Sequence, residues 1–532
     1  MNLPKPQYST FSTLLSDIER GIIKIPQFQR DFVWSIERAA KLMDSMIKGY
    51  PIGTFIFWKT KERLRSIRNL GGIKLPEPPN GDYVQYVLDG QQRLTSIFVT
   101  LKGFKVQRDE CEEDFSKMYI DLLAGEDEPI VITNIKEKEE ENIIKLNDLM
   151  FGGLTLLAAL PKEHHKKLEV YKQRIESYSF PTVLVEDAPI DLATEIFSRI
   201  NEGGKGLSVF EIMVAKTFSL ESEFDLKEKY DELIMDLYEV NYETISESTI
   251  LQSISVLLKN ECSKKAILSL DKNKFIDIWE KATEAIMSTV DYFRGFFRIP
   301  ASELLPYSAL IVPFTYFFYK NKSKKPSGEQ NKLLQDFFWR TSLSERYSHS
   351  QESRIAQDIE RINYMLKQKK AEYDYPVEYK ENYIIENGAF SVSRSYIKSI
   401  LCLYAYQQPK SFNDNSIVHI SNDFLKQSNS KNYHHFFPRA FLRENEVAER
   451  KINNVLNITI VDEYLNKRII SKKSPCDYMT KFLKENDKLE ETMKTHLIDD
   501  LNSFGIWEND YDKFITKRAN LVSEEIKKRL LL

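Results

Sequence analysis

Cysteine is scarce in this chain, and its placement excludes two classes of small stabilised fold. The 532 residues include four cysteines, at positions 111, 262, 402 and 476, and no two of them form a CxxC pair. This spacing argues against a zinc ribbon and against a disulfide framework. Scattered single cysteines suit a reducing compartment, so we expect a cytoplasmic protein.

Long hydrophobic runs and an excess of one charge are missing as well. No apolar run reaches the roughly 18 residues of a membrane span. The longest candidate, residues 309–319, contains Pro313 and favours a buried helix. The N-terminus does not have the form of a signal peptide. With 75 basic and 79 acidic residues the net charge is only −4, so any DNA-binding surface must be a local patch.

What the chain has is enough apolar material for several cores. Hydrophobic residues make up 42% of the sequence and aromatic residues 12%, and the length allows two to four domains of roughly 150 residues. The spacing predicts mixed strands and helices up to residue 215, then mainly helices from 216 to 395. Ser35 should cap a helix running to Ile47, and His164-His165 should lie at an exposed helix start. We expect strands at residues 50–58, 83–88, 118–122 and 182–185.

Residues 83–98 carry the most informative pattern. They predict a strand, a tight turn at Asp89-Gly90, and a helix opening at Gln91. A glycine turn before a helix directs free backbone N–H groups to a place where a phosphate can bind. Arg93 can add a planar, two-pronged donor, and Asp89 can hold a metal ion or a water. The alternative is an ordinary strand-to-helix corner, since such turns are common.

Three further segments accompany this DGQQR sequence: IPQFQRDFVW at 25–34, YPIGTFIFW at 50–58 and ATEIFSRIN at 193–201. Together they resemble the N-terminal ParB/sulfiredoxin-like domain of GmrSD-type, SspE-like modification-dependent restriction enzymes. The resemblance implies a nucleotide-hydrolysing sensor domain over residues 1–215, with Asp89 and Arg93 serving hydrolysis. The implied nucleotide-binding residues are Gln27, Arg30, Asp89, Gly90, Gln91, Gln92, Arg93 and Asn201. Arg30 could instead pair with Asp31 or Asp89, and Asn201 could be a simple helix cap.

A second group of polar residues lies near the C-terminus. NYHHFFPR at 432–439 is followed by the strand LNITIV at 456–461 and by Asn466. This order resembles an HNH (ββα-metal) nuclease, here over residues 396–532, so that the whole chain is expected to be α+β. The resemblance implies that His435 is the general base, a role that a neutral histidine with a pKa of about 6.5 can fill. It also implies that Asn457 hydrogen-bonds across the turn to orient His435, or contacts the backbone.

The same resemblance implies a divalent metal ion, Mg²⁺ or Mn²⁺, held by His434 and Asn466, which would neutralise the leaving oxygen. Histidine replaces the more frequent aspartate at 434, which leaves the preferred metal open. Lys467, Lys472 and Lys473 could grip DNA phosphates. Two alternatives stand beside this assignment. The histidine pair could be an ordinary surface loop, and Asn453 or Asn454 could be the working residue if the strand register is shifted.

These patterns predict an NTP-dependent, metal-dependent DNA endonuclease that restricts modified phage DNA. Its partners would be double-stranded DNA and a nucleotide, without a membrane, and homo-oligomerisation is left open. One alternative is a nucleotide-gated DNA-binding regulator with an inactive nuclease. Another is a nuclease that attacks RNA or host DNA and aborts infection. Arg340, Arg346 and Arg354 lie in an aromatic-rich stretch that we interpret as packing, without chemistry.

Overall fold

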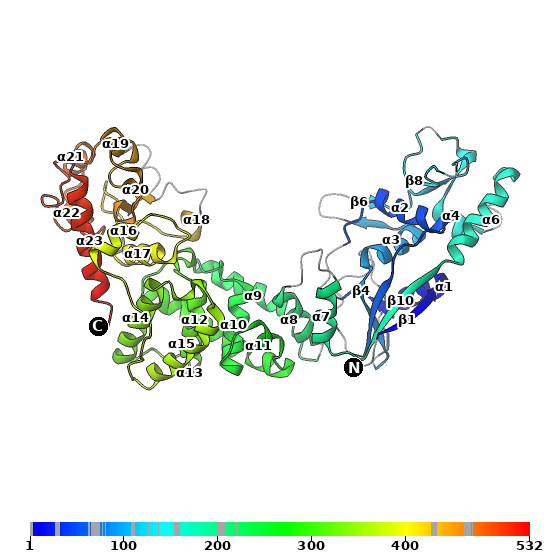
Figure 1. Ribbon diagram of the computed structural model, residues 1–532, viewed down its shortest axis with the longest axis horizontal. Helices are drawn as coiled ribbons and strands as arrows, with labels where there is room; N and C mark the ends of the chain where they lie inside the picture. The colour runs from blue at the N-terminus through cyan, green and yellow to red at the C-terminus, as the bar shows by residue number, and fades with distance from the viewer. Residues whose placement is uncertain are drawn as a thin grey trace. The chain divides into compact units, whose positions relative to one another are not determined.

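The computed structural model forms two compact units, residues 1–226 and 227–532. It describes residues 4–26, 32–61, 64, 75–76, 78–79, 81–107, 112–125, 127–136, 138–153, 160–200, 208–219, 221–426, 433–461, 470 and 472–532. The first unit mixes strands and helices and the second is mostly helical (Figure 1), so the predicted α+β class is confirmed. The predicted three-part division, with borders near 215 and 395, stays a prediction.

The first unit is built around a mixed sheet. Its helices and strands are β1 (Lys5–Thr10), α1 (Phe11–Glu19), β2 (Ile23–Lys24), α2 (Ile36–Ile47), β3 (Phe55–Thr60), β4 (Val84–Asp89), α3 (Gln91–Lys102), β5 (Lys105–Gln107), β6 (Glu112–Asp114), β7 (Tyr119–Asp121), β8 (Val131–Ile132), β9 (Ile143–Lys145), α4 (Leu146–Phe151), α6 (Lys162–Glu176), β10 (Ser179–Glu186), α7 (Ile190–Ile200) and α8 (Val209–Thr217).

The central sheet has the strand order β1-β10-β3-β4-β2. Strand β3 runs parallel to β10 and antiparallel to β4. Because successive side chains on a strand point to opposite faces, both faces of the sheet are apolar. Phe55 and Phe57 enter a core with residues of α1, α2 and α3, whereas Trp58 and Tyr86 enter a second core with residues of α7 and α8. The sheet therefore holds the end of β4, and the DGQQR sequence after it, in a fixed place.

Most of the predicted local structure of this unit is confirmed. The Ser35 hydroxyl caps α2 by accepting from the Arg38 N–H, and the four predicted strands correspond to β3, β4, β7 and β10. The prediction for His164 is wrong in one respect. Helix α6 does begin nearby, but His164 is only 4% exposed, and its Nε2 lies 3.0 Å from Oδ1 of Asn142. A buried amide partner satisfies the imidazole, which the local sequence does not reveal.

In its described part, the second unit contains helices and one short pair of strands. Its elements are α9 (Leu226–Glu239), α10 (Glu247–Lys259), α11 (Lys264–Leu268), α12 (Lys272–Gly295), α13 (Ile311–Lys320), α14 (Gly328–Leu343), the 3-10 helix η5 (Arg346–Ser348), α15 (Gln351–Leu366), α16 (Glu381–Asn387), α17 (Ser395–Tyr406), α18 (Asn422–Leu425), β11 (Tyr433–His435), α19 (Arg439–Glu444), α20 (Glu449–Ile452), the 3-10 helix η7 (Val455–Asn457), β12 (Ile458–Ile460), α21 (Pro475–Glu485), α22 (Leu489–Lys494) and α23 (Tyr511–Lys527).

Helix α13 lies at the centre of the helical part and packs against α10, α12 and α15. Residues 311–318, including Pro313, are buried, which confirms the buried helix predicted from this apolar stretch. In the described part of the chain, no helix combines the length and the apolarity that crossing a bilayer demands.

The end of α16 and the segment after it are hydrogen-bonded to residues 453–455 of the C-terminal part. The Val455 N–H donates to the Gly388 carbonyl at 2.7 Å, and the Phe390 N–H donates to the Asn453 carbonyl at 2.8 Å. The Asn454 side chain donates to the Ile385 carbonyl at 2.9 Å. The end of the helical region therefore supplies backbone partners to the segment that leads into β12.

Candidate functional site

The DGQQR sequence forms the predicted strand, turn and helix. Strand β4 ends at Asp89, and Gly90 begins α3 with a φ of 94°, a left-handed conformation that side chains rarely adopt. A Cβ at Gly90 would also lie 2.5 Å from Cδ1 of Phe55. Glycine is thus required here both by backbone conformation and by the close approach of the sheet. The geometry suits a phosphate at the first turn of α3.

Arg93 binds the chain that leads into β3. Its Nη1 donates to the Ile52 carbonyl at 2.7 Å, and its Nη2 donates to the Thr54 carbonyl at 3.0 Å. The same Nη2 forms an ion pair with Oδ2 of Asp89 at 3.0 Å. The guanidinium lies over the Phe55 ring, 5.1 Å from its centre. Arg93 therefore orients Asp89 and the turn, and its predicted contact with a nucleotide stays a prediction.

Gln92 links the DGQQR helix to a second segment of the predicted site. Its Oε1 accepts from the backbone N–H of Val33 at 2.9 Å and from that of Trp34 at 3.3 Å. The side chains of Gln91 and Gln92 are both buried, with exposures of 8% and 7%. The backbone of Val33 and Trp34, which follow the QFQR sequence, is thus fixed beside α3. Gln27, Arg30 and Asn201 themselves lie outside the described residues.

The C-terminal group of residues is built on two short strands. Strand β11 pairs antiparallel with β12, so that His434 faces Thr459 and His435 faces Ile458. Helix α21 follows, capped by Ser474. Asn466 and Lys467 lie outside the described residues, whereas Lys472 and Lys473 are exposed just before α21. The structure thus contains two antiparallel strands and a later helix in the predicted order.

Asn457 holds the chain that leaves β11. It is fully buried; its Oδ1 accepts from the Phe437 N–H at 2.8 Å, and its Nδ2 donates to the Phe437 carbonyl at 3.0 Å. Nδ2 also lies 3.3 Å from the Ile452 carbonyl. Two roles were implied for Asn457: to orient His435 across the turn, or to contact the backbone. The side chain of Asn457 hydrogen-bonds to backbone groups of Phe437, two residues beyond His435.

His435 instead contacts Asn453, one of the two asparagines that could replace Asn457 as the working residue if the strand register is shifted. Nε2 of His435 lies 2.9 Å from Oδ1 of Asn453, and Nδ2 of Asn453 donates to the Phe390 carbonyl at 3.1 Å. Because Nδ2 must be the donor to that carbonyl, Oδ1 must be the acceptor from the imidazole. Nε2 therefore carries the hydrogen, and Nδ1 keeps its lone pair. Among the described residues, Nδ1 has no hydrogen-bond partner.

The surroundings of His435 favour its neutral form. Burial lowers the pKa of His435 below 6.5, and the positive charge of Arg439 lowers it further, while the hydrogen bond to Asn453 acts in the opposite direction. A neutral imidazole with a free Nδ1 is able to accept a proton at neutral pH.

His434 lies in different surroundings, because neighbouring residues on a strand point to opposite faces. It is 2% exposed, and its ring is 6.3 Å from that of Phe412 and 6.2 Å from that of Tyr478. No group of three or more His, Cys, Asp or Glu side chains suited to a metal ion occurs in the part of the chain that is described. A metal ion held by His434 and Asn466 stays a prediction.

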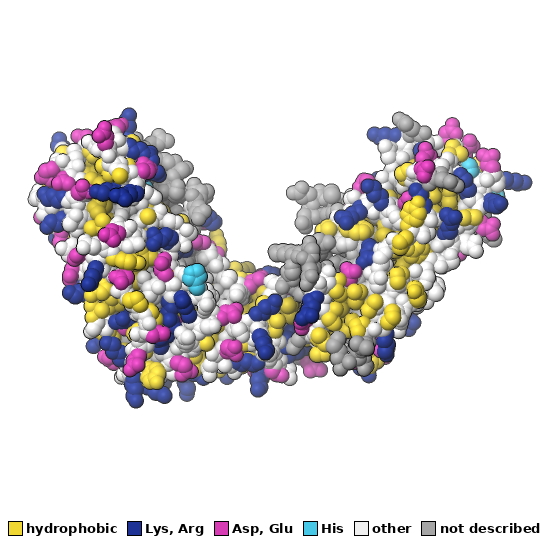
Figure 2. Space-filling model, viewed as in Figure 1, with side chains coloured by type: hydrophobic (Ala, Val, Ile, Leu, Met, Phe, Trp, Pro, Cys, Tyr) yellow, Lys and Arg dark blue, Asp and Glu magenta, His cyan; other side chains and the backbone are white. Residues whose placement is uncertain are grey.

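Charges of both signs are mixed on the face of each unit that Figure 2 shows. Basic and acidic side chains are interspersed on the visible face of each unit (Figure 2), without a large area of one sign. This agrees with the near-zero net charge of the sequence. On this face, contacts with DNA phosphates would have to come from small groups of basic residues rather than from one large basic area.

The first unit is similar to a known domain family. Residues 11–218 match the GmrSD restriction endonuclease, N-terminal domain. The matched range contains β3, β4, α3 and the whole DGQQR sequence, so this part of the chain is similar to the GmrSD N-terminal domain. The uncharacterized protein MJ0686 of Methanocaldococcus jannaschii is 26% identical, over 96% of this chain and 97% of its own length. That similarity extends through the second unit as well.

Proposed function

We propose that this protein is a metal-dependent DNA endonuclease that restricts modified phage DNA under the control of a nucleotide. The observation that carries the proposal is the hydrogen-bonded series His435–Asn453–Phe390, which fixes the imidazole with Nδ1 unprotonated and available. The match of residues 11–218 to a restriction-endonuclease domain supports the same class of activity.

In this proposal His435 acts as the general base. Its Nδ1 takes a proton from the attacking water, and Nε2–H donates to Asn453 throughout, stabilising the positive charge that develops on the ring. Asn457 keeps residues 436–437 in place, and with them the end of β11. We describe Asn457 and Asn453 as positioning residues, because neither needs to contact the scissile phosphate.

A divalent ion would be held by His434 and Asn466. One imidazole and one amide oxygen suit an ion that keeps several of its waters. When bound, the ion would neutralise charge on the phosphate and the leaving oxygen. Lys467, Lys472 and Lys473 would contact neighbouring phosphates.

The first unit would bind and hydrolyse a nucleoside triphosphate. The first turn of α3 would receive a phosphate, with Gln27, Arg30 and Asn201 completing the site around Asp89 and Arg93. The chain would comprise a ParB-like domain (1–215), a helical connector (216–395) and an HNH domain (396–532). The connector would relay the nucleotide state of the first domain to the HNH domain. Hydrolysis would restrain a nuclease that could otherwise damage host DNA.

The proposal is tested by incubating the purified protein with unmodified, glucosylated and phosphorothioated phage DNA. Each DNA is supplied with Mg²⁺ or Mn²⁺, and with or without each NTP. We expect cutting that depends on the metal, on the modification and on one NTP. Nucleotide binding without cutting of any DNA would favour the regulatory alternative, and cutting of RNA or unmodified DNA alone would favour abortive infection.

A further inference from the structure

The second unit contains a polar pocket that none of the described residues of β11 or β12 lines. It has a volume of about 410 Å³ and is formed by η5, the first two turns of α15 and the segment around Tyr375. The residues that matter for its chemistry are Arg346, Arg354, Ser350, Ser353, Asp374 and Tyr375. The volume falls within the range of small-molecule sites in proteins.

Arg346 is held rigidly at this pocket. It is 6% exposed, its Nε donates to Oδ2 of Asp358 at 3.0 Å, and its Nη2 donates to Gln357 at 2.8 Å. The ring of Tyr375 lies 4.5 Å from the guanidinium carbon. These contacts use Nε and Nη2, and they leave Nη1 without an acceptor among the described residues. A fixed guanidinium with one free end is preorganised to bind an anion.

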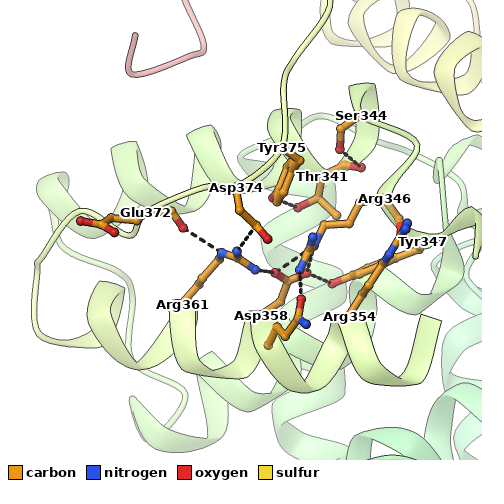
Figure 3. Close-up of polar contacts among 11 residues, drawn as sticks. Thr341, Ser344, Arg346, Tyr347, Arg354, Asp358, Arg361, Glu372, Asp374 and Tyr375 are labelled. Atoms are coloured by element: carbon orange, nitrogen blue, oxygen red, sulfur yellow. Dashed lines mark hydrogen bonds and ion pairs between the residues drawn. The ribbon is translucent and has the colours of Figure 1, made fainter. Parts of the chain in front are cut away.

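The two carboxylates beside the pocket already form ion pairs with arginines. Asp358 is fully buried and accepts from Arg346 and from Arg361, whose Nη1 is 2.6 Å from Oδ1 (Figure 3). Arg361 also pairs with Asp374 at 2.6 Å, and Asp374 is the single acid among the described residues that line the pocket. Asp358 and Asp374 are thus the ion-pair partners of Arg346 and Arg361.

Arg354 supplies the positive charge in excess. Its Nη1 donates to the Arg346 carbonyl, which holds the side chain at the pocket. No carboxylate of the described chain lies within ion-pair distance of it. Arg346 and Arg361 share Asp358 and Asp374, whereas Arg354 has no carboxylate partner in the described chain, so these five side chains carry one net positive charge.

Backbone and hydroxyl donors complete the lining. Helix α15 has 16 residues, and Ser350 at its start has a φ of 48° and makes no side-chain cap. The N–H groups of the first turn are therefore not satisfied by a capping side chain, and the helix dipole adds positive potential there. The hydroxyls of Ser350 and Ser353 lie at the same wall.

From this geometry we propose that the pocket binds the phosphate group of a small phosphate monoester. Guanidinium groups, hydroxyls and helix N–H groups are the donors that bind phosphate oxygens in proteins. Because the pocket is larger than an inorganic phosphate needs, the ligand carries an organic part, as a nucleoside monophosphate does. The site is separate from the nucleotide site proposed at Asp89–Arg93, and it stands whether or not that proposal is correct.

The test is calorimetric titration of the full chain with AMP, inorganic phosphate and adenosine, in the parent and in three variants. Arg354→Gln removes the charge at the pocket but keeps a donor for the Arg346 carbonyl. Arg294→Gln is the matched control, because Arg294 is a half-exposed cation on α12 of the same unit. Arg93→Ala removes the predicted N-terminal contact. Thermal unfolding of each variant checks that it is folded.

We expect AMP and phosphate to bind the parent and the Arg294→Gln protein alike, and adenosine not to bind at this site. The Arg93→Ala protein, which lacks the nucleotide contact proposed for the first unit, should still bind one equivalent of AMP at this pocket. In Arg354→Gln the Kd for AMP and phosphate should rise about tenfold or more, because a charge-assisted contact is lost. The proposal is overturned if Arg354→Gln binds AMP as the parent does, or if the parent binds neither probe at millimolar concentration. It is also overturned if Arg354→Gln weakens binding of duplex DNA while leaving AMP binding unchanged.

Discussion

Replacing Asn453 with alanine tests whether the hydrogen bond to His435 serves catalysis. The change removes Oδ1, which lies 2.9 Å from Nε2 of His435, and leaves the Nε2–H of a largely buried imidazole without its acceptor. An unsatisfied buried donor costs about 1–3 kcal/mol. If that cost falls on the transition state, where the ring becomes positively charged, the cleavage rate should fall roughly 5- to 150-fold.

The assay is the single-turnover rate of DNA cleavage at saturating DNA and metal, so that weaker binding does not affect the result. Asn445→Ala is the matched control, because Asn445 is an exposed asparagine whose side chain donates only to the Phe441 carbonyl. Asn453 also binds the Phe390 carbonyl, so the unfolding free energy of both variants must be measured. A folded Asn453→Ala protein that cuts within twofold of the parent rate would refute the role that we assign to this hydrogen bond.

Three other predictions follow from the geometry. Arg93→Ala should abolish NTP hydrolysis, whereas Arg174→Ala, which likewise removes one arginine bound to a backbone carbonyl of the first unit, should not; equal rates of phosphate release in the two variants would contradict the assignment. Gly90→Ala should lower the unfolding free energy by about 2 kcal/mol or more, measured by urea denaturation, because alanine at a φ of 94° costs about 1–2 kcal/mol and its Cβ would clash with Phe55. Burial lowers the pKa of His496 to about 3, so it stays neutral in the fold while the unfolded chain takes up a proton below pH 6.5. Its contribution to stability is therefore complete above pH 6.5 and is lost at up to about 1.4 kcal/mol per pH unit as the pH falls toward 3, and a His496→Gln variant should show a shallower slope in pH-dependent unfolding.

The strand–turn–helix at residues 84–102 could be predicted because its signals are local. A short apolar run of valine, tyrosine and leucine defines β4, and glycine is the residue best suited to the conformation at position 90. The same is true of the Ser35 cap and of the buried helix α13. In each case the residues that determine the structure lie within one turn or one strand of each other.

Contacts between distant segments could not be predicted. Nothing near Arg93 in the sequence indicates that it binds carbonyls 39 and 41 positions away. The contact of His435 with Asn453 depends on how the chain returns over 18 positions, and Asn453 is itself placed by the Phe390 carbonyl, 63 positions upstream. Asn457 was identified only through the resemblance to the HNH pattern, because its partner Phe437 is likewise 20 positions away in the sequence.

The pocket at Arg346 is a similar case. Its arginines lie in an aromatic-rich stretch that we interpreted as packing, and the stacking of Arg346 on Tyr375 is indeed a packing contact. The stretch does not reveal that Asp358 and Asp374 pair with Arg346 and Arg361 and leave Arg354 without a carboxylate, since the two acids lie on different elements.

The measurement that tests the central claim most directly is cleavage of modified phage DNA by His435→Ala beside His419→Ala. His419 is an exposed histidine of the same unit, so its removal controls for the loss of an imidazole. The account predicts that His435→Ala binds nucleotide and DNA but does not cut, while His419→Ala cuts at the parent rate. A His435→Ala protein that still cuts with Mn²⁺ present would contradict the assignment of His435 as the base.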